Sequence, residues 1–347
     1  MRLSSLTMLV RPVVRSCPAA LAALLLLAFG GCAPSFLVTP VNNTADLEEQ
    51  TVQPGGWGGG KIAIVEVEGM LANARTGALL GGPGENVVSK FAQQLDAAER
   101  DSAVKAVVLR VNSPGGTVTA SDTMYELVRR FRQKTGKPVV ASTQEVAASG
   151  GYYVACAADK IVAQPTSVVG SIGVIFEAIE FQDTLSKLGV TTTAIKSGSL
   201  KDLGSPWRHL KGDERAVMQQ MVDEYFARFV AVVKERRPVT EPVAADLNDY
   251  KKDGYAGAFS GRVFSGAKAV ELGLADRTGL LADALDEARR LANAPKASAV
   301  LYARPFGDGG SIYAATSAPA PQAGVVRLAL PEQAGVLPTG FYYLWHP

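Results

Sequence analysis

In the middle of the chain, short apolar runs alternate with stretches in which apolar residues recur at helical spacing. The apolar runs have the length and composition of β-strands, and they cover Lys61–Val67, Val104–Val111, Pro138–Thr143 and Lys160–Ala163. Between the first three of them, apolar residues recur every three or four positions, from Val87 to Leu95 and from Met124 to Phe131. A strand, a helix and a second strand form the repeating unit of a parallel sheet. The pattern therefore predicts an α/β fold with a twisted parallel sheet and flanking helices.

The second half of the chain adds mainly helical patterns. Val190–Ile195 is a further apolar run of the strand type, whereas Asp213–Arg236 carries the apolar stripe of a long amphipathic helix. Shorter helices are predicted for Glu241–Asn248 and Leu280–Ala292. These helices either cover the sheet or pair with another subunit. The tail is rich in Pro, Gly and Ala, but its aromatic end, residues 341–345, is not typical of a linker, so we expect that end to dock on a surface.

The first 31 residues have the order of an export signal. Three arginines and no acidic residue precede the apolar run Ala19–Phe29, which is short for a permanent membrane span. The following sequence, Phe29-Gly30-Gly31-Cys32, resembles a lipoprotein processing site, so Cys32 is the expected point of lipidation. The alternative is an uncleaved leader that serves as the anchor. In both cases we expect an exported body that is held at a membrane and faces the periplasm or another extracytoplasmic space.

The composition excludes several classes of protein and site. With 47% hydrophobic residues, and Lys+Arg 35 against Asp+Glu 33, the chain can bury a core but has no basic excess for binding nucleic acid. Beyond the first 32 residues it has one cysteine, Cys156, which we interpret as a core residue. One of its two histidines, His346, lies next to the C-terminus, which leaves His209. We therefore expect no metal site and no cofactor.

Two loops of small residues directly follow predicted strands, at Asn112–Gly116 and Ala147–Gly151. In open parallel sheets, binding sites form at the carboxyl ends of strands. Glycines let a ligand approach the backbone closely and present N–H groups to a forming oxyanion. Ser149 opens a short helix predicted over Tyr152–Ala157. Each loop taken alone also fits an ordinary turn or a helix cap.

A serine nucleophile needs a base, and His209 has no obvious acidic partner in the sequence. A neutral lysine is the alternative. Lys201 lies in the small-residue loop Ser197–Pro206, where burial would lower its pKa toward the catalytic range. On its own, Lys201 fits a solvated surface lysine better than a catalytic one.

Four segments together resemble the signal peptide peptidase A family of serine peptidases. They are Asn112–Gly116, Ala147–Ala163, Gly170–Val174 and Ser197–Pro206. Their order matches that of the family, and so does the interval between Ser149 and Lys201. Four motifs in register are far more specific than any single turn. The resemblance covers Lys61 to roughly Leu291, about two thirds of the chain.

The resemblance implies a Ser/Lys dyad. Ser149 would be the nucleophile, Lys201 the general base, and Ser171 the serine whose hydroxyl orients the lysine. The N–H groups of Gly150 and of either Gly115 or Gly116 would form the oxyanion hole. The implied substrates are short, unfolded, hydrophobic peptides such as remnant signal peptides, cleaved after small or apolar residues.

The resemblance also implies an architecture. The fold would be the core shared by Clp proteases and crotonases, and the chain would assemble into a homo-oligomeric ring whose sites take serine and lysine from neighbouring subunits. The expected parts are a lipoprotein-type signal peptide (1–31), a flexible tether (32–60), a peptidase domain (61–297) and a helical C-terminal extension (298–347).

Two other functions stay open from the sequence. An acyl-CoA-processing relative on the same fold would use the glycine loops as an oxyanion hole without a serine nucleophile. It explains Asn112–Gly116 but not Lys201, and an exported protein rarely meets acyl-CoA. A non-catalytic envelope scaffold is the other alternative, although every proposed catalytic position is filled.

Overall fold

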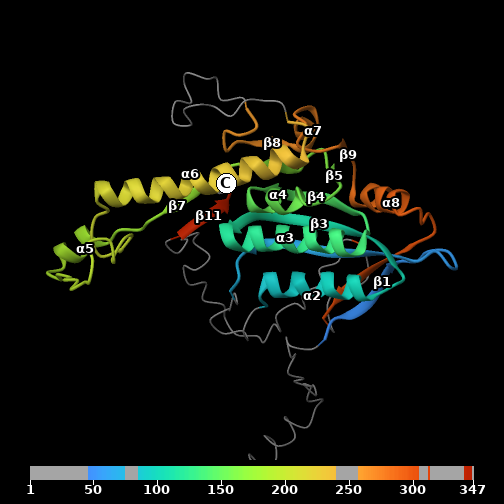
Figure 1. Cartoon of the computed structure of the whole chain (residues 1–347), viewed down its shortest axis with the longest axis horizontal. Helices are drawn as coiled ribbons and strands as arrows, with labels where there is room; N and C mark the ends of the chain where they lie inside the picture. The colour runs from blue at the N-terminus through green and yellow to red at the C-terminus, as the bar shows by residue number, and fades with distance from the viewer. Residues whose placement is uncertain (1–45, 75–84, 240–256, 305–311, 313–339, 346–347) are drawn as a thin grey trace, which may run out of the picture. The chain divides into compact units, whose positions relative to one another are not determined.

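The computed structural model describes residues 46–74, 85–239, 257–304, 312 and 340–345. Within these residues, eleven strands form one mixed, mostly parallel sheet, whose main path has the order β1-β10-β2-β3-β4-β5-β9 (Figure 1). The strands are β1 (Glu48–Gln53), β2 (Lys61–Leu71), β3 (Val104–Thr117), β4 (Val139–Ala148), β5 (Lys160–Ala163), β6 (Val168–Gly170), β7 (Ile175–Glu177), β8 (Val263–Ser265), β9 (Arg277–Thr278), β10 (Ser298–Ala303) and β11 (Gly340–Leu344). The helices are α2 (Val87–Arg100), α3 (Val118–Thr135), α4 (Gly150–Ala155), α5 (Gln182–Lys187), α6 (Gly212–Arg236), α7 (Gly266–Glu271) and α8 (Leu281–Leu291).

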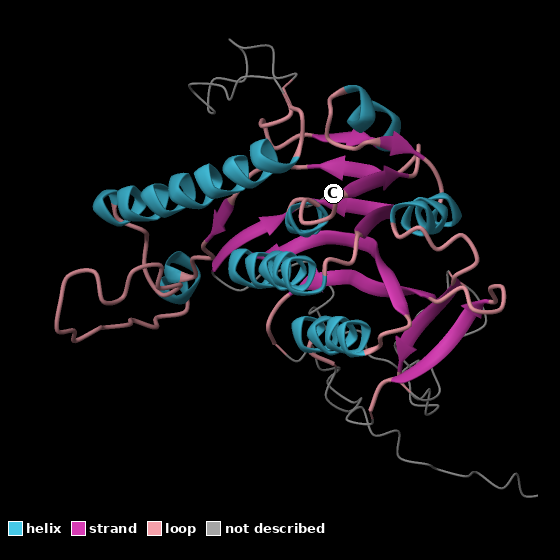
Figure 2. Cartoon of the chain, turned by 45° about the vertical axis from the view of Figure 1, so that its right-hand side comes forward, coloured by secondary structure: helices cyan, strands magenta, loops and turns pink. Residues whose placement is uncertain are grey.

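Helices cover both faces of the sheet (Figure 2). On one face, β2 residues such as Val65 share a core with Phe91 of α2 and Val128 of α3. On the other face, Ile64 packs in a second core with Leu285 of α8. Strands that are buried on both faces carry continuous apolar runs, which is why the strand patterns in the sequence do not alternate. The α/β fold and the four strands predicted from Lys61 to Ala163 are confirmed.

The segment Asn112–Gly116, expected as a turn, is the end of strand β3. Gly115 pairs with Met70 of β2 on one side and with Leu344 of β11 on the other. The strand then passes into α3 at Thr117, whose side chain accepts the N–H of Ala120 at 3.3 Å and caps the helix. Because it is paired on both edges, the glycine segment stays extended despite its turn-like composition.

Both ends of the expected peptidase domain are extended by further strands. Residues 48–53, expected as part of a flexible tether, form β1 and pair antiparallel with β10. β10 itself pairs parallel with β2, so it belongs to the main sheet. The described residues of 298–347 contain the strands β10 and β11 and no helix, so the expected helical extension is wrong for this part of the chain.

Other elements differ less from the prediction. α4 begins at Gly150, two residues earlier than expected, because the turn at Ser149 starts it directly. Val190–Ile195 has no regular structure and is exposed, so the strand predicted there is wrong. The leader with Cys32, the predicted helix at Glu241–Asn248 and His346 lie outside the described residues. None of the helices that the structure describes is long and apolar enough to cross a membrane.

Candidate active site

Ser149 occupies a sharp turn between β4 and α4. Its backbone has φ 49° and ψ −116°, a conformation that costs energy for a residue with a side chain. Its N–H donates to the Gly170 carbonyl at 2.7 Å, and its own carbonyl accepts the N–H of Tyr153 at 2.8 Å. The residue is 1% exposed, and its Oγ has no hydrogen-bond partner in the described part of the chain. The side chain does not cap α4, so the hydroxyl is left available for another role.

Ser171 and Ser149 directly follow the ends of two paired strands, β6 and β4. β6, which ends at Gly170, runs parallel to the end of β4, and Ala148 lies opposite Gly170. Ser171 also has a positive φ, 50°, and its N–H donates to the Arg262 carbonyl at 2.7 Å. Among the described non-glycine residues, only Ser149, Ser171 and Asn293 have positive φ. Backbone strain of this kind concentrates at functional sites, and here it marks both predicted serines.

The two glycine loops converge next to Ser149. Gly115 has φ 106°, and a Cβ added to it would lie 2.7 Å from the Gly150 nitrogen. Ser113 Oγ accepts the N–H of Gly115 at 3.1 Å, so that donor is engaged. Gly116 lies opposite Tyr343 in the antiparallel ladder with β11. Since Trp345 donates to Pro114 at 2.8 Å, the alternation of such ladders makes Gly116 and Tyr343 the next hydrogen-bonded pair.

The C-terminal strand β11 lies across this convergence of loops. It is antiparallel to the end of β3 on one edge and to β7 on the other (Figure 1). A Cβ on Gly115 would lie 2.0 Å from the Tyr343 carbonyl oxygen, and a Cβ on Gly150 would lie 3.0 Å from the same atom. The backbone of β11 therefore occupies the space next to both glycine loops. The expectation that the aromatic end docks on a surface is confirmed.

The side chain of Tyr343 fills an aromatic pocket. It is 0% exposed, and its ring centroid lies 5.1 Å from that of Tyr153 and 4.8 Å from that of Phe229. Its hydroxyl donates to the Tyr225 carbonyl of α6 at 2.8 Å. A buried tyrosine whose hydroxyl finds a partner is a favourable contact, so β11 is firmly held.

Lys201 lies on an exposed turn before α6 rather than in a buried pocket. Its ammonium has no hydrogen bond or ion pair within the described residues, so the chain by itself does not bring Lys201 to the Ser149 hydroxyl. The burial expected for this lysine is therefore not found in the single chain. The segment that leads into α6 is unusual for its exposed large apolar side chains, namely Phe181, Leu188, Val190, Ile195, Leu200 and Trp207.

His209 does have acidic partners, contrary to the expectation from the sequence. Its Nδ1 lies 2.8 Å from Glu180 and its Nε2 lies 3.1 Å from Asp183. The hydrogen bond with Glu180, followed by that with Asp183, raises the pKa of His209 and favours the charged ring. The Ser149 hydroxyl has no hydrogen-bond partner among the described residues, so it is not bonded to this ring. His209 is therefore not the base for Ser149 in this arrangement.

Cys156 is confirmed as a core residue. It is 0% exposed, and burial raises the pKa of its thiol. A buried neutral thiol is a poor nucleophile. Across the described residues, no group of three or more His, Cys, Asp and Glu side chains is placed to hold a metal ion.

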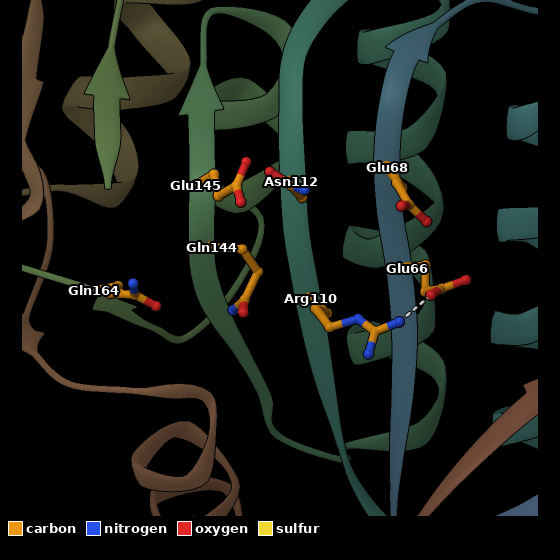
Figure 3. A pocket seen from close by; sticks show the side chains of 7 residues that line it. All are labelled: Glu66, Glu68, Arg110, Asn112, Gln144, Glu145 and Gln164. Atoms are coloured by element: carbon orange, nitrogen blue, oxygen red, sulfur yellow. Dashed lines mark hydrogen bonds and ion pairs between the residues drawn. The ribbon is translucent and has the colours of Figure 1, made fainter. Parts of the chain in front are cut away.

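A polar pocket reaches the start of the Asn112–Gly116 loop (Figure 3). It lies on the face of the strands that also carries Ile64 and Val108. Its lining residues are Glu66, Glu68, Arg110, Asn112, Gln144, Glu145 and Gln164. Arg110 forms an ion pair with Glu66, which also bonds Lys90 at 2.8 Å. None of the predicted catalytic residues lines this pocket, so its charges serve the sheet rather than the chemistry of Ser149.

Two family models match this chain. The model of peptidase family S49 matches residues 131–295, and the model of Clp protease matches residues 59–169. Both ranges contain Ser149 and α4.

Several relatives match over most of the body. A protein of Enterococcus faecium that is named for signal peptide peptidase SppA is 34% identical over 257 residues, which are 74% of this chain and 71% of that protein. A Methanocaldococcus jannaschii protein that is named as a protease is 38% identical over 60% of this chain and 63% of its own length. The chloroplastic serine protease SPPA of Arabidopsis thaliana is 30% identical over 71% of this chain and 35% of its own length. The chain thus spans less than two thirds of the archaeal and plant relatives.

Proposed function

Because this chain belongs to peptidase family S49 and is a serine peptidase, we propose that Ser149 is its nucleophile and Lys201 its general base. The proposal rests on the backbone conformation and the surroundings of Ser149. Its strained turn, its buried and unpartnered hydroxyl, and the two glycine loops beside it match what an acyl-transfer nucleophile needs.

The proposed reaction follows from these positions. Neutral Lys201 takes the proton of the Ser149 hydroxyl while Oγ attacks the carbonyl carbon of the cleaved bond. The negative oxygen is stabilised by the N–H groups of Gly150 and Gly116, since the Gly115 N–H is engaged by Ser113, and a single donor of this kind contributes roughly 3 kcal/mol. The lysine then returns the proton to the leaving amine, and it activates the water that releases the acyl product. Ser171 holds the lysine through its hydroxyl.

The base is proposed to come from a second copy of the chain. Two features support this assembly: Ser149 lacks a basic partner within the described residues of its own chain, and Lys201 lies on an exposed segment. The apolar side chains around Lys201, such as Leu200 and Trp207, would be covered in a ring of such copies.

The position of β11 supports a binding mode for the substrate. An extended peptide would add to the edge formed by Gly115–Thr117, as β11 does now, and would place a carbonyl next to Gly150. If the peptide followed the course of β11, the residue on the acyl side of the cleaved bond would enter the pocket now filled by Tyr343. The aromatic walls of that pocket favour a bulky aromatic or apolar side chain, which agrees with the apolar but not with the small residues that the resemblance implies. Unfolded hydrophobic segments such as signal peptides fit this mode.

The proposed location is the extracytoplasmic side of a membrane. It rests on the basic and apolar leader and on Cys32, which would carry the lipid anchor.

Peptidyl phosphonates test this site directly, because they form a covalent bond with an activated serine. We expect a probe with tyrosine next to the phosphorus to label Ser149 roughly 10- to 100-fold faster than the matched glycine probe, since burial of an aromatic side chain contributes about 1.5–3 kcal/mol. Mass spectrometry of the labelled peptide identifies the residue, and the labelling rates give the preference. Labelling at another serine contradicts the proposed nucleophile, and equal rates contradict the proposed pocket.

Shortening the chain to residue 339 should raise the activity on a short peptide. β11 covers the glycine loops, so the chain must release this strand before a substrate can bind there. Removing it is expected to lower KM roughly tenfold, because a site that is rarely open binds with a reduced apparent affinity. A chain lacking only residues 346–347 is the control. The two variants are compared by steady-state kinetics and thermal unfolding, and an unchanged KM in a folded shortened chain argues against occlusion.

A further inference from the structure

Lys201 lies in a stretch that is held by turns rather than by a helix or strand. The Lys201 N–H donates to the Gly198 carbonyl at 3.2 Å, and the Ser205 N–H donates to the Asp202 carbonyl at 3.0 Å. An exposed turn with so few backbone hydrogen bonds needs further contacts to keep one conformation.

Those contacts converge on Asp202, the residue after Lys201. Its carboxylate accepts Arg208 Nε at 2.8 Å and Arg208 Nη2 at 2.8 Å, and it forms an ion pair with Lys196. Arg208 also donates to the Asp202 backbone carbonyl at 3.0 Å. A bidentate arginine with a further backbone contact fixes orientation as well as distance.

Arg208 is in turn fixed to the first turn of α6. It donates to Glu214 Oε2 at 2.8 Å and bonds Oε1 at 2.5 Å, and the Glu214 side chain is 0% exposed. The same carboxylate accepts the N–H of Lys211 at 3.0 Å. The turn that carries Lys201 is therefore fastened through Asp202 and Arg208 to a buried residue of the longest described helix.

We propose that Arg208 and Asp202 are positioning residues for the base Lys201, an inference that rests on the proposed function. Arg208 holds the turn in one conformation. Arg208 and Lys196 also pair with the Asp202 carboxylate. Without these partners, that carboxylate would stabilise the protonated form of Lys201. The charged groups around the turn are Lys196, Asp202, Arg208 and Lys211, with Glu214 on α6, and each of the two carboxylates has a cationic partner. The network thus leaves the lysine without a free anionic neighbour.

This pairing persists over the working pH range. Arg208, and after it Lys196, hold the pKa of Asp202 well below its usual range, and the same arginine lowers the pKa of Glu214. Both carboxylates are therefore charged and paired throughout the range in which a lysine gains or loses its proton.

The test compares Arg208→Gln with Arg215→Gln, an exposed arginine of α6, in the full chain with a short peptide substrate. We expect Arg208→Gln to lower kcat roughly 10- to 100-fold with little change in KM, and to move the acid limb of the pH–rate profile to higher pH. The double variant Asp202→Asn with Arg208→Gln should return the limb to its wild-type position while kcat stays low. Arg215→Gln should match the wild type in both readouts.

Other results distinguish a failure of the positioning role from a failure of the proposed base. A lowered melting temperature with an unmoved limb in Arg208→Gln gives the network a purely structural role and overturns the inference. Lys201→Ala, measured beside it, tests the proposed function itself: an active Lys201→Ala refutes the base, whereas an inactive one together with an unmoved limb refutes only the positioning. If Arg208→Gln does not fold or assemble, Arg208→Lys decides. A lowered kcat with an unmoved limb is then expected, because the charge remains but the bidentate geometry is lost, and an unchanged kcat overturns the inference.

Discussion

Replacing Ser149 with alanine should abolish peptide hydrolysis, with a loss in kcat of roughly 10⁴-fold or more. The hydroxyl is the atom that forms the covalent intermediate, and no neighbouring group within the described residues replaces it. Cys156 is buried with a raised thiol pKa, and Ser171 lies in a separate strained turn. The rate is measured with a fluorogenic peptide, and folding and assembly are followed by circular dichroism and size-exclusion chromatography.

Ser167→Ala is the matched control for Ser149→Ala. Ser167 is also 1% exposed, but its hydroxyl lies 2.7 Å from that of Thr143 and serves the packing of the sheet. Its loss should cost about 1 kcal/mol of stability and leave kcat nearly unchanged. If the two variants retain similar activity, Ser149 is not the nucleophile. An intact fold is expected in Ser149→Ala because the Ser149 hydroxyl makes no hydrogen bond among the described residues.

The central sheet was predictable from the sequence because its strands are buried on both faces. Burial of β2, β3 and β4 requires continuous apolar runs, and the helices between them need one apolar stripe facing the sheet. These patterns are local, so they are visible without knowledge of the fold. The turn at Ser149 was also predictable, since the small-residue segment Ala147–Gly151 follows a predicted strand directly.

Features that depend on distant partners were not predictable. Asn112–Gly116 has the composition of a turn, but it stays extended because β2 and β11 pair with its two edges. β11 is more than 200 residues away in the chain, and its pairing has no local signal. The acidic partners of His209 are Glu180 and Asp183, which lie more than 25 positions earlier in the sequence. Only the folded chain brings them close to His209.

The structure around Lys201 was also not predictable from the local sequence. Val190–Ile195 is apolar enough for a strand, yet no neighbouring strand pairs with it among the described residues, and Ile195 is fully exposed. A β pattern without a partner edge is not stable in water. The sequence pattern and the observed exposure are reconciled if a second copy of the chain covers this region, which is the assembly proposed above.

Mixing two inactive variants tests that assembly. Ser149→Ala keeps Lys201, and Lys201→Ala keeps Ser149, so a site built from two chains can regain both groups when the variants assemble together. With random mixing in a closed ring, about one quarter of the sites would contain both intact residues. We therefore expect activity to return to roughly a quarter of the wild-type value after the separated subunits are mixed in equal amounts and allowed to reassemble.

The control is the double variant Ser149→Ala with Lys201→Ala on one chain, mixed with either single variant. Each such mixture lacks an intact copy of one of the two groups, so it should stay inactive although it assembles equally well. A site formed within one chain makes the opposite prediction for the main experiment, because no subunit in that mixture carries both residues. Persistent inactivity in a mixture shown to contain mixed oligomers would refute the shared site. It would then require the exposed turn at Lys201 to fold back onto Ser149 of its own chain.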